Sequence, residues 1–290
     1  MATLPNFPPS ARRMDTWLPI PSGDRQQTVT NVRVDTPLAY EFQTDPDEGN
    51  RILHAWTDRS TAAATVRLRF ACTRREERAL PADGQKNVST TATPSHRQLQ
   101  PDRLGVIDDH IRSLAARITA GKSDVLSRGR ALYDYVIGHM AYDKVTPGWG
   151  KGDTLRACQV GKGNCTDFSA LFISLSRGSG IPARFKIGCQ VPLTLREGAI
   201  AGYHCWAEFW APAIGWVPVD ASEAWKDSSR HEFYFGNLDS NRIEFSLGRD
   251  VRLPGAQGEA QNYLFAPVAE IDGHAVAVER SLVLLPRPPD

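Results

Sequence analysis

Apolar and polar residues alternate along the first part of the chain. Three segments show this period of two and are rich in β-branched residues, which predicts strands: 28–44, 52–58 and 64–71. In the third segment Val66, Leu68 and Phe70 would share one face, and arginines would take the other. This pattern is typical of an antiparallel sheet with one solvated face. We therefore expect a small β module over residues 26–80.

Irregular segments flank this module. Residues 1–25 are rich in proline and polar residues without clear periodicity, which predicts an irregular arm on the surface. Residues 81–100 contain Pro, Gly, Ser, Thr and Asn, which is typical of a linker or a long loop. The sequence thus predicts an N-terminal arm and β-rich module over residues 1–100.

The period changes to that of a helix after residue 100. An apolar stripe predicts one helix over 102–120, with Asp102 as its N-cap, and a second over 124–140, capped by Ser123 or Asp124. Residues 141–160, which contain Pro147, Gly148, Trp149 and Gly150, predict a loop.

A glycine-rich turn then leads into one cysteine. Within residues 161–182, the spacing of Phe168, Leu171, Phe172 and Leu175 predicts one apolar helical face. Cys165 would lie at the first turn, where free N–H groups and the helix dipole favour a thiolate.

Strand patterns dominate the rest of the chain. Five segments fit single strands: 183–191, 202–211, 215–220, 231–236 and 242–246. Residues 262–285 predict two more, divided by the hairpin dipeptide Asp272-Gly273. Helices followed by strands predict an α+β domain over residues 101–290.

Two of these strands carry groups that could act on Cys165. His204 lies in the aromatic segment 202–211, and Asp220 ends the next strand, so a hairpin would make them neighbours. A nucleophile, its base and a carboxylate that orients the base form a catalytic set. Cys205 alternates with His204, and we expect it to point away from this site.

Four motifs in this order resemble the transglutaminase-like superfamily of papain-fold cysteine enzymes, especially its bacterial branch. They are Gly-x-Gly-Asn-Cys-Thr-Asp-Phe, Gly-Ile-Pro-Ala-Arg, His-Cys-Trp-Ala-Glu and Gly-Trp-x-x-x-Asp, and the resemblance covers roughly residues 125–250. It implies Cys165 as nucleophile, His204 as base and Asp220 as third member. It also implies a papain-like, transglutaminase-like core in which the nucleophile helix packs on an antiparallel sheet.

Further side chains are candidates for supporting roles. Papain-like proteases place an oxyanion-donating glutamine six residues before the nucleophile, the position of Gln159, although a polar loop residue is the simpler interpretation. The backbone N–H of Cys165 is the alternative donor. Trp149, in the loop before the nucleophile turn, is a candidate substrate contact. We expect Asp167 to tie the glycine turn and Glu208 to pair across strands.

The net charge and the apolar content of the chain argue against some classes of function. The 290 residues carry a net charge of +1, which gives no argument for nucleic acid, and no apolar run is long enough to span a membrane. The first ten residues lack the apolar segment of a signal peptide. As written this favours the cytoplasm, whereas a leader removed upstream would allow export, which is common among similar bacterial proteins.

No metal, cofactor or disulfide framework is expected. The five cysteines include no Cys-x-x-Cys pair, and no EF-hand or phosphate-binding loop is present. We therefore predict a thiol-dependent enzyme acting on an amide, peptide or isopeptide bond of a protein or peptide, with hydrolysis favoured. The alternatives are a true transglutaminase, transfer from a thioester donor, or a non-catalytic scaffold. The β module could dock a partner that the sequence does not identify.

Overall fold

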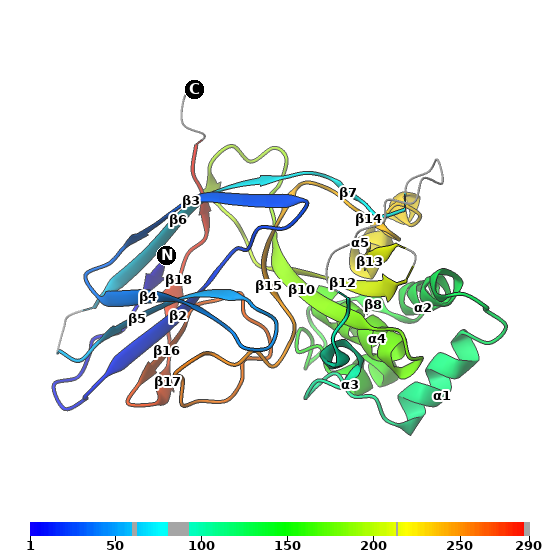
Figure 1. Cartoon of the computed structure of the whole chain (residues 1–290), viewed down its shortest axis with the longest axis horizontal. Helices are drawn as coiled ribbons and strands as arrows, with labels where there is room; N and C mark the ends of the chain where they lie inside the picture. Colours follow the sequence, from blue (N-terminus) through cyan, green and yellow to red (C-terminus); the bar gives the residue numbers. More distant parts are fainter. Residues whose placement is uncertain (60–62, 81–92, 213, 287–290) are drawn as a thin grey trace. The chain divides into compact units, whose positions relative to one another are not determined.

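Two compact units make up the protein. The computed structural model describes residues 1–59, 63–80, 93–212 and 214–286. Unit 1 consists of residues 1–75, 187–203 and 241–290, and unit 2 of residues 76–186 and 204–240. Unit 1 is built from strands, whereas unit 2 contains the helices (Figure 1).

A five-stranded antiparallel sheet forms one part of unit 1. Its strand order is β17-β16-β2-β5-β4. The bounds are β2 Met14–Ile20, β4 Ala39–Thr44, β5 Arg51–Thr57, β16 Val268–Ile271 and β17 His274–Val276. The predicted hairpin at Asp272-Gly273 is confirmed, because the chain turns there between β16 and β17. Segments from both ends of the chain thus share one sheet.

The prediction of an irregular arm over residues 1–25 was wrong. Strand β2 lies between β16 and β5, and Met14, Trp17 and Ile20 are fully buried. Burial on both faces removes the alternation that marks a half-exposed strand. The polar residue Thr16 is satisfied inside the sheet, since its hydroxyl donates to the carbonyl of Val268 at 2.9 Å.

A second sheet of unit 1 has the order β18-β1-β6-β3. Its strands are β1 Ala2–Thr3, β3 Gln27–Asp35, β6 Thr65–Arg74 and β18 Glu279–Arg280. The predicted strands over 28–44, 52–58 and 64–71 are confirmed as β3, β4, β5 and β6. Apolar side chains that include Leu4, Phe7, Leu18, Leu53 and Val66 form the core of this unit. Smaller elements are β11 Gly198–Ala199 paired with β19 Val283–Leu284, and β15 Arg242–Leu247.

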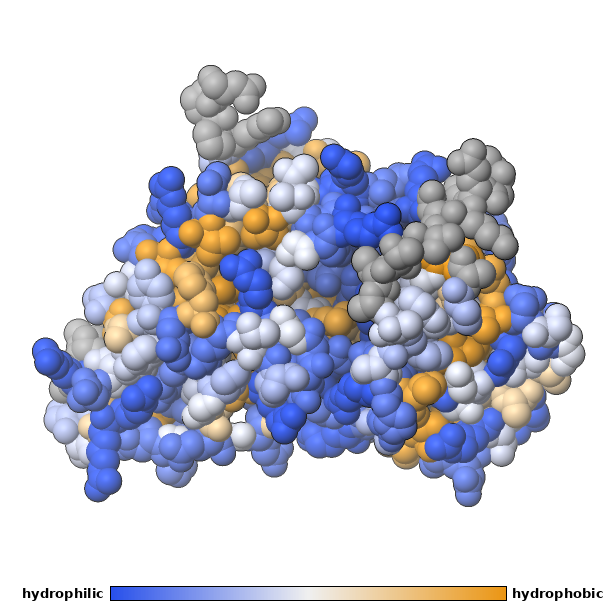
Figure 2. Space-filling model, viewed as in Figure 1, coloured by the Kyte–Doolittle hydropathy of each residue, from blue (hydrophilic) through white to orange (hydrophobic). Residues whose placement is uncertain are grey.

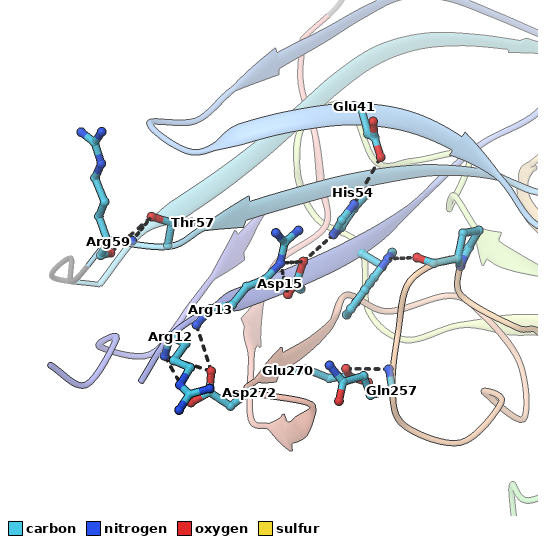
Figure 3. A network of polar contacts seen from close by, with 12 residues as sticks. Arg12, Arg13, Asp15, Glu41, His54, Thr57, Arg59, Gln257, Glu270 and Asp272 are labelled. Atoms are coloured by element: carbon cyan, nitrogen blue, oxygen red, sulfur yellow. Dashed lines mark hydrogen bonds and ion pairs between the residues drawn. The ribbon is translucent and has the colours of Figure 1, made fainter. Parts of the chain in front are cut away.

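A polar network lies on the five-stranded sheet (Figure 3). The ring of His54 stacks between Trp17 and Trp56, with ring centroids 5.0 Å away on each side. Its Nε2 lies 2.7 Å from Oδ1 of Asp15, which also accepts a hydrogen bond from Nε of Arg13. Buried polar groups need such partners. The network therefore allows an imidazole to be buried in the sheet.

Helix α4, Cys165–Gly178, is the centre of unit 2. It contacts β12 His204–Ala211 and four other helices. These are α1 Asp109–Ile118, α2 Val125–His139, α3 Thr154–Val160 and α5 Ala221–Lys226. Strand β13 Gly215–Val219 pairs with β12, and β10 Ala183–Gln190 lies on the other side of β12. The predicted nucleophile helix on an antiparallel sheet is thus confirmed.

Burial surrounds α4 on every side. All residues from Cys165 to Arg177 are buried, and not only the predicted apolar face. The polar ones have partners: Oγ of Ser174 lies 2.8 Å from Oγ1 of Thr154. Arg177 forms an ion pair with Asp102 at 2.8 Å. Because both charges are desolvated, loss of either partner would be costly.

The structure confirms the bounds of one predicted helix and shows that another begins later than predicted. The predicted helix 124–140 is confirmed as α2, with the side chain of Asp124 capping it. The predicted helix 102–120 begins later, as α1, because Asp108 accepts a hydrogen bond from the N–H of Ile111. Asp102 is not the cap, since it binds Arg177 instead.

Two further segments differ from the predictions. The predicted loop 141–160 contains α3, capped by Asp153, which is too short to show an apolar stripe. It also contains β8 Ala141–Tyr142, which pairs in parallel with β9 Lys162–Gly163. The predicted strand 231–236 is mostly turn, with one bridge between Val219 and Phe235. The aromatic residues there fill the core beside α2, so their apolar character reflects packing.

The linker and the domain boundary were predicted near residue 100. Residues 81–92 of the linker lie outside the described residues, and the short helix η1, His96–Leu99, follows. The division into residues 1–100 and 101–290 remains a prediction. The two compact units of the structure have different boundaries. Strands such as β16, far along the chain, complete a sheet that begins near the N-terminus, because sheet pairing is set by tertiary contacts.

Hydrophilic residues cover most of the visible face, with smaller apolar areas between them (Figure 2). This agrees with a chain that is 41% apolar and 23% charged. Across the described ranges, no helix combines the length and the apolar character needed to cross a membrane.

Candidate active site

Cys165 is the first residue of α4, as the sequence predicts. Asn164 caps the helix: its side chain accepts from the N–H of Thr166 at 2.9 Å. Asp167 reciprocates by accepting from the N–H of Asn164 at 2.9 Å. This capping box fixes the turn before Cys165. It places the thiol among the free N–H groups of the first helical turn, where negative charge is stabilised.

Asp167 also ties the preceding loop to the helix. Its carboxylate accepts from the N–H of Gly150 at 2.7 Å and of Gly152 at 3.0 Å. Burial raises the pKa of Asp167, although these N–H groups oppose the change. Gly163 is required beside it, because a Cβ there would lie 2.3 Å from Oδ2 of Asp167. The glycine before Cys165 therefore makes room for a carboxylate, and the predicted structural role of Asp167 agrees with these contacts.

The His204–Asp220 pair is formed by the predicted hairpin. Strands β12 and β13 are antiparallel, with Ala207 opposite Val219 and Ala211 opposite Gly215. Beyond the end of this ladder, Nε2 of His204 lies 2.6 Å from Oδ2 of Asp220. Both side chains are buried. Because Nε2 is taken by Asp220, Nδ1 is the ring nitrogen left for Cys165.

Asp220 serves two elements at once. Its Oδ2 holds His204, while Oδ1 accepts from the N–H of Glu223 and the hydroxyl of Ser222, both at 3.1 Å. It is therefore the N-cap of α5. The carboxylate makes both contacts, so α5 holds the carboxylate in position against the imidazole.

Electrostatics favour an ion pair between Cys165 and His204. Hydrogen bonding with the Cys205 side chain lowers the pKa of Cys165 well below its ordinary value, against the effect of burial, and His204 lowers it further. Burial alone would lower the pKa of His204. The charge of Asp220 and the hydrogen bonds to Asp220 and Cys165 outweigh it and raise this pKa to about 9. A thiolate beside an imidazolium is the reactive form of a cysteine nucleophile.

The prediction that Cys205 points away from the site was wrong. Its Sγ lies 3.4 Å from Oγ1 of Thr166, the residue that follows Cys165 in α4. Hydrogen bonding with Cys205 also lowers the pKa of Cys165. The side chain of Cys205 therefore lies against the start of α4.

Three aromatic rings lie beside the nucleophile turn, and sequence analysis missed two of them. Tyr142, Phe168 and Trp225 have centroids 6.3–6.4 Å apart. Phe168 is one helical turn after Cys165. Tyr142 is opposite Gly163 in the β8–β9 pair, and Trp225 is 39% exposed. No motif marks Tyr142 or Trp225, because only β8 and α5 bring them here.

Gln159 and Trp149 have no described contact with the Cys165 side chain. Gln159 lies in the last turn of α3 and is exposed. Trp149 is 36% exposed, in the loop whose next residue, Gly150, is bound by Asp167. Their roles as oxyanion donor and substrate contact stay predictions.

Glu208 shares the strand of His204 but has a separate role. It forms ion pairs with Arg184 at 2.5 Å and with Lys186 at 2.9 Å. Burial opposes its ionisation, but these cations lower the pKa of Glu208 to about 2. Its cross-strand pairing was predicted, and it holds β12 against β10. In the part of the chain that the structure describes, this site included, no group of three or more His, Cys, Asp or Glu could hold a metal ion.

A family model and one bacterial protein are similar to this chain in sequence. Residues 112–221 match the model of the transglutaminase-like superfamily. An uncharacterized protein of Haemophilus influenzae is 22% identical over 306 residues, which cover 91% of this chain and 82% of that protein.

Solved structures show the likeness in fold. A candidate cysteine protease from Cytophaga hutchinsonii has a TM-score of 0.62 at 15% identity, covering 98% of this chain and 86% of that one. The periplasmic domain of TgpA from Pseudomonas aeruginosa has a TM-score of 0.36 at 14% identity, covering 73% and 97%. Residues 112–221 of this chain are thus similar to the transglutaminase-like superfamily, and the chain shares its fold with the candidate cysteine protease from Cytophaga hutchinsonii.

Proposed function

We propose that the protein is a thiol-dependent acyl-transfer enzyme that acts on an amide, peptide or isopeptide bond. The observation that carries this proposal is the buried His204–Asp220 pair, 2.6 Å apart, beside a cysteine at the first turn of a buried helix. Few structural roles require an imidazole, a carboxylate and a thiol with opposed pKa shifts in one place.

The chemistry follows from these groups. The Cys165 thiolate attacks the amide carbonyl and forms a tetrahedral oxyanion. Asn164 binds the N–H groups of Thr166 and Asp167, and the N–H of Cys165 at the same helix start is the donor that we propose for that oxyanion. The His204 imidazolium then gives its Nδ1 proton to the leaving amine. Asp220 at Nε2 keeps the ring oriented and stabilises its charge.

The acyl-enzyme next transfers its acyl group. Water attacks the thioester, His204 accepts a proton from it, and the carboxylic acid leaves as the Cys165 thiolate re-forms. An amine in place of water would give a new amide, which is the transglutaminase reaction. We favour hydrolysis, because no acceptor site or calcium control is visible in the sequence.

One observation favours the non-catalytic alternative. Cys165 is only 2% exposed, so a substrate carbonyl reaches it only if neighbouring groups move. Tyr142 and Trp225 are partly exposed and stack on each other, and we expect them to move or to contact substrate.

Alkylation of Cys165 by iodoacetamide as a function of pH tests the proposal. Peptide mass spectrometry separates Cys165 from the other four cysteines, and wild type is compared with His204→Ala. An ordinary thiol is half ionised at about pH 8.5. We expect Cys165 to be alkylated fast well below that pH in the wild type, and more slowly in the variant. An ordinary thiol profile that the variant leaves unchanged would support the scaffold instead.

A second experiment tests whether water or an amine accepts the acyl group from the acyl-enzyme. A pool of peptide amides is incubated with the protein in the presence of a labelled primary amine, with Cys165→Ala as the control. Release of free acid without incorporation of label supports hydrolysis. Label that enters product only in the wild type supports transamidation.

A further inference from the structure

Unit 1 contains a cavity of about 330 Å³ that the proposed mechanism does not use. Strands β2, β6, β11, β15 and β18 contribute residues to its walls. Cys165, His204 and Asp220 belong to unit 2, and none of them lines this cavity. The volume is within the range of roughly 300–1,000 Å³ that is common for the sites of small ligands. The cavity is therefore a candidate binding site separate from the catalytic groups.

Aromatic side chains form one wall of the cavity. The ring of Phe245 packs edge to face against Phe70 and Phe265, with ring centroids 5.9 Å and 5.3 Å away. Leu18 and Ile200 are buried and add aliphatic surface. Protein cores leave few voids larger than a water molecule. A hollow of this size, among rings that pack on one another, fits an apolar ligand.

One cation lies at this apolar cavity. Arg280 is the only lining residue with a charged side chain in the part of the chain that the structure describes. Its guanidinium carbon lies 5.5 Å from the centroid of the Phe265 ring, and no carboxylate pairs with it among the described residues. Arg280, Ala199 and Gly202 are exposed, so they mark the side of the cavity that opens to solvent. The charge is thus at the opening, whereas the buried walls are apolar.

We propose that this cavity binds one amphipathic anion, an unbranched aliphatic chain that ends in a carboxylate. The chain lies among the apolar walls, and the carboxylate accepts hydrogen bonds from the planar guanidinium of Arg280. Because a water molecule takes about 30 Å³ of liquid, the cavity has room for about eleven groups of that size. A chain of about eight to ten carbons matches this space. The site goes beyond the proposed function and does not depend on it.

Calorimetric titration of the full chain with octanoate and with octanol tests the role of the charge. We expect one octanoate to bind per chain, and Arg280→Gln to weaken it roughly 10- to 100-fold, as for loss of a hydrogen bond between charged groups. Arg280→Lys should keep part of the affinity. Octanol has no charge and should bind wild type and Arg280→Gln equally. Arg33→Gln, at another exposed arginine of unit 1, is the matched control.

A second substitution tests the place of binding. Ala199→Trp puts a large ring at the opening and should weaken both ligands at least tenfold. Circular dichroism and urea unfolding check that each variant is folded. Failure of wild type to bind octanoate, or equal affinity in Arg280→Gln, would overturn the proposal. A dimer in size-exclusion chromatography that Ala199→Trp dissociates would also overturn it, since a second copy would then cover the cavity. Cys165→Ala should bind octanoate like wild type, so the result is independent of acyl transfer.

Discussion

Asp220 shows how much one side chain does in this site. One carboxylate oxygen holds His204, and the other caps α5 through Ser222 and Glu223. A substitution can therefore affect the imidazole, the helix or both. A conservative amide replacement separates the two, because its oxygen can still cap while its charge is gone.

Asp220→Asn should lower the rate of acyl transfer by about 10²- to 10⁴-fold, because the amide neither stabilises the imidazolium nor selects its tautomer. The cap of α5 should persist, so any fall in the free energy of unfolding reports the loss of the buried charge pair between His204 and Asp220. The measurement is single-turnover acylation together with urea unfolding. Ser222→Ala, which loses only the hydroxyl bond to Oδ1, is the control and should keep most of the rate. A full rate in Asp220→Asn would contradict the assigned role.

The Cys165–His204 pair also has a thermodynamic signature. The pKa of His204 is raised from 6.5 to about 9, so alone it would stabilise the fold below pH 6.5 and lose that effect as pH rises through 9. Cys165 has the opposite sign: its lowered pKa stabilises the fold above its ordinary value of 9.0 and less so below it. Between pH 6.5 and 9, folding moves a proton from the Cys165 thiol to the His204 imidazole, with no net uptake or release of protons. The pair should then add no pH slope to the free energy of unfolding.

The substitution Cys165→Ala should make the free energy of unfolding depend on pH. His204 still holds a proton in the folded state because of Asp220, whereas the unfolded chain releases it above pH 6.5. The free energy of unfolding should fall as pH rises from 6.5, by at most about 1.4 kcal/mol per pH unit. Urea unfolding at several pH values measures this. The double variant Cys165→Ala/His204→Gln should again be flat, and a flat single variant would mean that His204 is not protonated.

At the scale of elements, turns and helix starts build the site. Asp167 joins the 143–153 loop to α4, and Gly163 leaves the space that its carboxylate occupies. The first residues of β12 carry His204 and Cys205, and the Cys205 side chain lies beside Thr166 of α4. A loop and a helix start held by rigid elements thus position these side chains.

Gly163→Ala should destabilise the fold by about 1–3 kcal/mol, because the new Cβ would lie 2.3–2.5 Å from Asp167 atoms and would displace that side chain. Alkylation of Cys165 should change as well, since the same carboxylate caps its helix. Urea unfolding and alkylation rates give the two readouts. Gly138→Ala in α2 meets nothing within 4 Å and should be neutral or stabilising by up to about 1 kcal/mol. Similar effects of the two substitutions would refute the steric argument.

At the scale of the molecule, unit 1 is assembled from three separate segments of the chain. Strand β2 near the N-terminus lies between β5 and β16, although more than 240 residues separate β2 from β16, as the pairing of Asp15 with Glu270 shows. Trp17 and Ile52 also pack with Val251 and Leu264. The parts of unit 1 therefore depend on each other.

Deletion of residues 1–100 tests the predicted domain boundary. We expect the fragment 101–290 to bind a hydrophobic dye and to aggregate, because removal of Trp17 and Ile52 uncovers Val251, Leu253 and Leu264. Dye fluorescence and size-exclusion chromatography compare it with the full chain. A monomeric fragment with cooperative unfolding and wild-type alkylation of Cys165 would support a boundary at residue 100.

The sequence by itself determined the local parts of this protein. Period and capping residues were enough for α2, the start of α4 at Cys165 and the β12–β13 hairpin, because each depends on contacts close in sequence. Motif order was enough to indicate the superfamily. The nearness of His204 to Asp220 followed from the hairpin alone.

Tertiary structure decided what depends on distant partners. It made residues 14–20 a central strand, buried α4 on all sides and placed Cys205 against Thr166 at the start of α4. It also brought Tyr142 and Trp225 together beside Phe168 of α4. Burial on two faces removes the periodic signal, and a contact with a distant helix sets the direction of Cys205. In both cases the neighbours across the fold, and not the local pattern, set where a side chain lies.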